Sequence, residues 1–123
     1  MSRLLLGVCL ALLASVAGAD GVGNKWRLEV SGNAESAGRI VLQLAPAEGD
    51  PIRATVDVAD GRSENGVARD VRDALQAQAG KRYKVEVDDG EDVLVKKDDG
   101  ERDFVVTIVE NSVRGVRIEI DAE

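Results

Sequence analysis

The sequence has no histidine, a single cysteine and only three aromatic residues among its 123 residues. Without His, the chain has no imidazole base, no Ser-His or Cys-His pair and no imidazole ligand for a metal ion, which excludes the commonest hydrolase and zinc chemistries. With one Cys it cannot close an internal disulfide, so a folded domain depends on its hydrophobic core. These absences favour a role other than catalysis.

Hydrophobic residues make up 44% of the chain, and 23 acidic side chains outnumber 16 basic ones. The apolar fraction is too high for a wholly disordered chain, and the length suits one domain. The net charge of −7 disfavours nucleic acid and anionic lipid surfaces as partners, because both repel an acidic domain. Solubility alone also explains such a charge.

The first 19 residues have the pattern of a cleavable signal peptide. Arg3 supplies a positive start, Leu4–Val16 is an apolar run, and Ala17-Gly18-Ala19 has the small-x-small pattern that signal peptidase cleaves. A membrane anchor is the alternative, but the apolar run is shorter than the roughly 20 residues that a span needs. We therefore predict an exported protein, periplasmic or secreted and not integral to a membrane.

Cleavage after Ala19 leaves residues 20–123 as a single mature domain. It removes Arg3, so 15 basic side chains face 23 acidic ones and the net charge becomes −8. It also removes Cys9, the only cysteine.

Hydrophobic periodicity predicts seven strands and one helix in the mature chain. Residues 64–79 repeat apolar side chains at helical spacing, with Ser63 or Asn65 as the cap and Gly80 just past the end. Elsewhere apolar and polar residues alternate or run together as in strands. The predicted strands cover residues 26–30, 39–44, 52–58, 83–87, 93–95, 104–109 and 116–120.

The last four predicted strands are joined by short turns, two of which contain Asp-Gly. Because Asp-Gly supplies the positive backbone angles of tight hairpins, these four strands are expected to form an antiparallel meander. We predict an α+β domain, a mostly antiparallel sheet of about seven strands with one amphipathic helix (about 64–79) packed on one face.

The two Asp-Asp-Gly turns are the most conspicuous chemical feature. We predict that their carboxylates form an acidic rim that docks on another protein, which can be cationic. Weak calcium binding through the first turn is the alternative, although the spacing of an EF-hand is missing. We predict no catalytic residue, no metal site and no cofactor. The rim consists of Asp88, Asp89, Glu91, Asp92, Asp98, Asp99, Glu101 and Asp103.

One resemblance covers residues 52–120. The segments Ala54–Gly61, Val67–Leu75, Tyr83–Val87 and Val93–Lys96 resemble the small strand-helix-strand-strand module of flagellin, hook-associated and phage tail proteins. The helix here is richer in charge than in that module, and flagellar members leave the cell without a cleavable signal. The resemblance implies a structural or interaction role and transfers no site residues.

These observations favour a small, acidic, exported protein-interaction or structural domain that is not an enzyme. A periplasmic inhibitor of a basic hydrolase is one alternative. An enzyme that uses only carboxylates and lysine is the second.

The signal peptide predicts the start of the mature protein. Intact-mass analysis of the exported protein should show the loss of residues 1–19 and a new N-terminus at Asp20. A protein that keeps Met1 in a membrane fraction would contradict the prediction.

Overall fold

The structure is a computed structural model that describes residues 22–123. The predicted signal peptide and Cys9 lie outside the described residues. Seven strands and one helix follow one another in the order expected from the periodicity. They are β1 (Lys25–Ser31), β2 (Gly38–Pro46), β3 (Ile52–Val58), α2 (Glu64–Ala79), β4 (Tyr83–Asp88), β5 (Asp92–Lys97), β6 (Phe104–Asn111) and β7 (Arg117–Ala122).

The helix begins and ends where the sequence predicts. The Ser63 hydroxyl accepts a hydrogen bond from the Gly66 N–H (3.1 Å), which satisfies one of the free donors of the first turn. Gly80 ends the helix with a positive φ of 59°. The apolar stripe includes Val67, Val71 and Leu75, which are fully buried.

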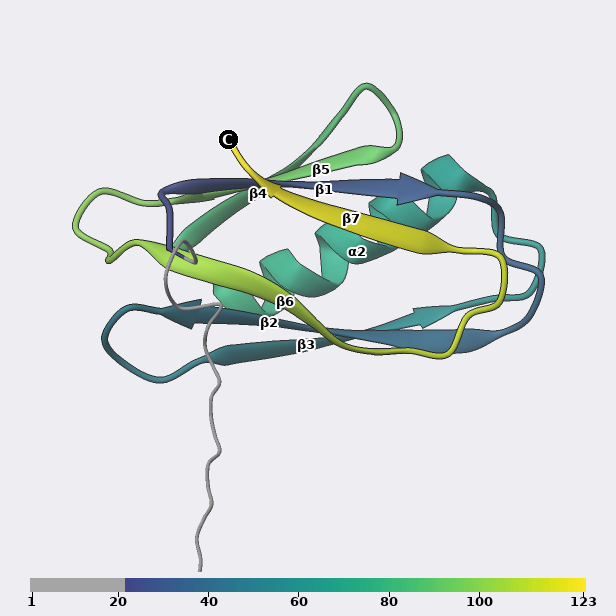
Figure 1. Cartoon of the computed structure of the whole chain (residues 1–123), viewed down its shortest axis with the longest axis horizontal. Helices are drawn as coiled ribbons and strands as arrows, with labels where there is room; N and C mark the ends of the chain where they lie inside the picture. Colours follow the sequence, from purple (N-terminus) through teal and green to yellow (C-terminus); the bar gives the residue numbers. More distant parts are fainter. Residues whose placement is uncertain (1–21) are drawn as a thin grey trace, which may run out of the picture.

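The strands form two antiparallel sheets, which corrects the prediction of one sheet with the helix on its face. One sheet has the order β4-β5-β1-β7 and the other has the order β3-β2-β6. Helix α2 lies between them and packs chiefly against β3 and β4 (Figure 1). The meander is also wrong beyond its first hairpin, because β6 pairs with β2 and β7 pairs with β1.

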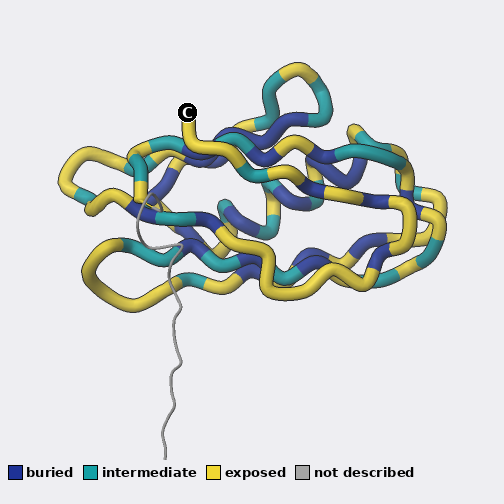
Figure 2. The backbone as a smooth tube through the Cα atoms, in the orientation of Figure 1, coloured by how far each residue is buried: buried dark blue, intermediate teal, exposed yellow. Residues whose placement is uncertain are grey.

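Burial of apolar surface explains the two sheets. A single sheet of seven strands is about 34 Å wide. A helix of 16 residues is about 24 Å long and about 10 Å across, so it cannot cover such a sheet. Folding the sheet in two turns the apolar faces of all seven strands toward one core, and Figure 2 shows that buried residues occur in both layers.

The three aromatic residues connect the two sheets at one end of the core. The Phe104 ring, fully buried on β6, packs 4.8 Å from the Tyr83 ring on β4. The carbonyl oxygen of Phe104 accepts hydrogen bonds from the Trp26 indole N–H (2.8 Å) and the Gly23 N–H (2.9 Å). We call Trp26, Tyr83 and Phe104 the aromatic junction, because it holds the starts of β1, β4 and β6 together.

Burial confirms the core residues expected from the apolar phase of each element. All of them are at most 9% exposed, and they come from both sheets and the helix. They are Val56, Val71, Leu75, Val85, Phe104, Val106 and Ile118. Within residues 22–123, no helix has the length and hydropathy that crossing a bilayer requires.

The aromatic junction predicts a large effect of Phe104→Ala. Removing a fully buried ring should lower the free energy of unfolding by about 3–5 kcal/mol. Val109→Ala, on the same strand at 45% exposure, should change it by less than about 1 kcal/mol. Urea denaturation of the mature domain measures both values, and a loss below about 1 kcal/mol for Phe104→Ala would contradict the role of the junction.

Candidate functional site

The outer face of the four-stranded sheet carries nearly all of its charged side chains. The alternate residues of β4, β5, β1 and β7 that do not enter the core lie on the opposite face of this sheet. We call this surface the outer face. Its side chains belong to Lys84, Glu86, Asp88, Asp92, Leu94, Lys96, Lys25, Arg27, Glu29, Arg117, Glu119 and Asp121.

Pairing of the strands brings three lysines into one row across the outer face. Lys84 on β4 lies opposite Lys96 on β5, which lies opposite Lys25 on β1. Neighbouring strands are about 4.8 Å apart, so the backbone positions of this lysine row span about 10 Å. Like charges directly opposite one another destabilise a sheet, so this arrangement is costly.

A row of carboxylates crosses the same sheet at the other end. Asp88, Asp92, Glu29 and Glu119 lie directly opposite one another on β4, β5, β1 and β7. We call these four residues the acidic row. It lies four residues along β4 from the lysine row, a separation of about 13 Å. The outer face therefore carries a row of lysines at one end, with Glu86 and Glu123 close by, and a row of carboxylates at the other, with Arg117 close by.

Arg27 stands between the two rows and neutralises part of the acidic one. Its guanidinium forms ion pairs with Asp92, with Asp88 (3.3 Å) and with Glu123 (3.0 Å). Asp92 is 9% exposed, so the ion pair with Arg27 offsets part of the cost of burying its carboxylate. The hydrogen bond from Arg27 holds the pKa of Glu123 below its ordinary value. Glu29 and Glu119 are exposed and take part in no ion pair among residues 22–123.

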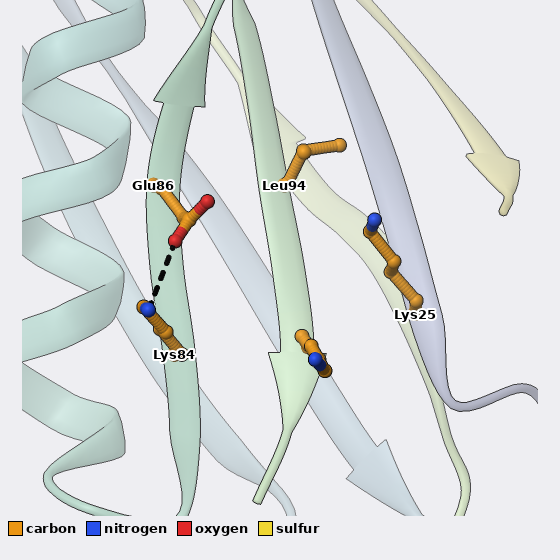
Figure 3. Close-up of a pocket in the computed structure, with 5 residues that line it drawn as sticks. Lys25, Lys84, Glu86 and Leu94 are labelled. Atoms are coloured by element: carbon orange, nitrogen blue, oxygen red, sulfur yellow. Dashed lines mark ion pairs between the residues drawn. The ribbon is translucent and has the colours of Figure 1, made fainter.

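A depression of about 260 Å³ opens beside the lysine row. Its lining is all three lysines, Glu86 and the side chain of Leu94. Figure 3 shows Lys84 and Glu86 on one strand, Leu94 on the next and Lys25 beyond it. Lys84 is paired with Glu86 at 3.3 Å. In the described chain, Lys25 and Lys96 take part in no ion pair, and both also line a neighbouring depression next to Asp99.

The predicted acidic rim is divided between opposite ends of β5. One group surrounds the β4–β5 hairpin, and the other follows β5, whose six residues separate them by about 20 Å. In the hairpin, Asp89 and Gly90 have the positive φ angles that Asp-Gly predicts, 52° and 79°. The hairpin group is Asp88, Asp89, Glu91 and Asp92, and the second group is Asp98, Asp99, Glu101 and Asp103.

The second acidic turn is a connection between the sheets and not a hairpin. The Glu101 N–H donates to the Asp98 carbonyl (3.1 Å), and Gly100 has a positive φ of 92°. The Glu101 carboxylate is paired with Arg82 (3.3 Å), and its carbonyl accepts a hydrogen bond from the Lys97 ammonium (3.0 Å). Part of the charge and hydrogen-bonding capacity of this turn is therefore used in contacts within the domain.

Among residues 22–123, no three His, Cys, Asp or Glu side chains come together in a way that could hold a metal ion. In the hairpin, two of the four carboxylates, those of Asp88 and Asp92, share Arg27 as their ion-pair partner. Calcium binding therefore has to compete with an arginine already in place.

The lysine row was not predictable from the sequence. Of the three lysines, only Lys84 lies within a predicted strand, whereas Lys25 and Lys96 lie one residue outside the predicted strands 26–30 and 93–95 and belong to the longer strands of the structure. Their alignment depends on which strands pair and in which register, and periodicity does not specify either. The acidic hairpin was visible because its residues are neighbours in the sequence.

Searches against protein-family models and against curated proteins found no match to this chain. The order β3-α2-β4-β5 follows the strand-helix-strand-strand succession on which the flagellin-like resemblance rests. That resemblance stays a prediction.

The position of Arg27 predicts how Arg27→Gln changes stability with pH. The substitution should lower the melting temperature at pH 7, because it leaves Asp92 partly buried without its cation. In the wild type, the lowered pKa of Glu123 adds stability above the pKa of the unfolded chain, and that stability is lost as pH falls through the folded pKa. The gap between the two proteins should therefore narrow below about pH 4.

Arg117→Gln is the matched control. It removes the same charge from the outer face of β7, where Arg117 takes part in no ion pair within the described chain. Thermal denaturation from pH 3 to 8 measures the difference. Equal melting temperatures for the two variants at pH 7 would show that Arg27 does not hold the acidic row.

Proposed function

We propose that the chain is an exported, non-enzymatic domain that binds a cationic protein through the acidic end of its outer face. This end comprises the acidic row and the hairpin residues Asp89 and Glu91. The proposal keeps the interaction role expected from composition. It replaces the eight-residue rim with a surface that is continuous across four strands.

The sorting of charge into rows carries the proposal. A sheet that needed only solubility would be more stable with opposite charges facing one another across its strands. Here four carboxylates face one another, and only two of them share an internal cation. An arrangement that costs stability without improving packing is typical of a binding surface.

The chemistry of the acidic end supports binding over catalysis. Glu29 and Glu119 are exposed, whereas a carboxylate acid–base pair usually needs burial to shift its pKa. Exposed charges act mainly on the rate of encounter and on the choice of partner. The same surface suits an inhibitor of a basic hydrolase, which is the narrower form of the proposal.

A double substitution at the acidic row tests the proposed function. Glu29→Gln with Glu119→Gln removes two exposed charges and leaves the Arg27 network intact. We expect the association rate with a cationic protein, captured from a periplasmic extract and then purified, to fall about three- to tenfold at low salt. Surface plasmon resonance measures this rate, and the loss should shrink near 0.5 M salt.

Asp50→Asn with Asp60→Asn is the matched control, since it removes the same charge from two exposed loops elsewhere. Because the net charge of the two variants is identical, overall charge cannot explain a difference between them. An acidic captured partner, or equal association rates for the two variants, would contradict the proposed function.

A further inference from the structure

The lysine row is not explained by the proposed function. It lies at the opposite end of the outer face from the acidic row, and its charge repels a cationic partner. Three ammonium groups come from three strands, in a chain whose acidic side chains outnumber the basic ones by seven. Two of the three, on Lys25 and Lys96, lack an ion-pair partner among residues 22–123.

We propose that the lysine row and its depression form a binding site for a phosphate monoester group. The ammonium groups of Lys25, Lys84 and Lys96 would surround the phosphoryl oxygens. The depression between them has a volume of about 260 Å³, which is large enough for one such group with a few carbon atoms.

The side chains in the depression favour this ligand over a carboxylate. All three cations are lysines, whose ammonium groups bind phosphate as point charges. The depression has no arginine, the residue whose planar guanidinium binds a carboxylate through two parallel hydrogen bonds. Phosphate monoesters carry close to two negative charges at neutral pH, which matches several ammonium groups better than a single carboxylate does.

The remaining surroundings favour one compact anionic group over a polyanion. The acidic row begins about 13 Å away, so a long anionic chain that continued along the strands would meet carboxylates. Leu94 provides an apolar contact in the depression, where the carbon part of an ester can lie. The ligand is therefore a small phosphate ester, either free in solution or exposed as a lipid headgroup.

In this structure, Glu86 weakens the proposed phosphate site. Its carboxylate is paired with Lys84 and lines the same depression, so it competes with the phosphoryl group for that ammonium. Removing its charge should strengthen phosphate binding, a gain that general damage to the fold would not produce.

Isothermal titration of the mature domain with inorganic phosphate and with phenyl phosphate tests the proposal. Lys25→Gln and Lys96→Gln should each weaken binding of both probes about fivefold, and Glu86→Gln should strengthen it by a similar factor. Phenyl phosphate should bind more tightly than inorganic phosphate because its ring can contact Leu94. Added salt should weaken all of these interactions.

Arg39→Gln and Glu110→Gln are matched controls on the outer side of the three-stranded sheet. Arg39→Gln changes the net charge by the same amount as Lys25→Gln or Lys96→Gln, and Glu110→Gln by the same amount as Glu86→Gln. Both controls should leave phosphate binding unchanged. Glu29→Gln with Glu119→Gln should not weaken it, so failure of this site and failure of the acidic end are separate results.

Co-sedimentation with phosphatidylcholine vesicles, with and without phosphatidic acid, distinguishes the two sources of the group. Capture that needs phosphatidic acid and is lost in Lys96→Gln supports the site with a lipid ligand. Binding of the soluble esters alone supports it with a free ligand. If neither binds, or if Lys96→Gln and Arg39→Gln behave alike, the proposal is wrong.

Discussion

The aromatic junction sets where β1 lies along its sheet, and the chemistry of the outer face depends on that position. Apolar periodicity alone would allow β1 to slip by two residues and still bury Leu28 and Val30. The hydrogen bonds of Gly23 and Trp26 to the Phe104 carbonyl prevent such a slip, because they fasten the start of β1 to the other sheet. The Tyr83 ring, packed on Phe104, fastens the start of β4 to the same strand of the other sheet.

The charged rows follow from this alignment. Lys25 precedes Trp26 and Lys84 follows Tyr83, and the pairing through β5 offsets these two aromatic residues by two positions along the sheet, which places the two lysines at one level. The β4–β5 hairpin then places Lys96 between them. Four residues further along β4, the same pairing lines up the carboxylates, and Arg27 offsets part of their repulsion. One surface thereby carries opposite charges at its two ends.

Local features of the fold were predictable from the sequence, whereas its long-range pairing was not. Ser63 and Gly80 mark the ends of the helix by capping chemistry, and Asp89-Gly90 marks its hairpin by backbone angles, so short segments contain the necessary information. The division into two sheets depends on whether one helix can cover seven strands. That is a property of the whole chain. The alignment of the three lysines likewise depends on which distant strands pair. The acidic hairpin does not, because its residues are neighbours in the sequence.

The central claim is that the outer face has two binding ends of opposite charge. Amide NMR spectra of the isotopically labelled mature domain, titrated separately with phenyl phosphate and with a tetralysine peptide, test it most directly. The account predicts that phenyl phosphate shifts the signals around Lys25, Lys84 and Lys96, and that tetralysine shifts those around Glu29 and Glu119. Shifts from both probes at the same residues, or chiefly on the three-stranded sheet, would contradict it.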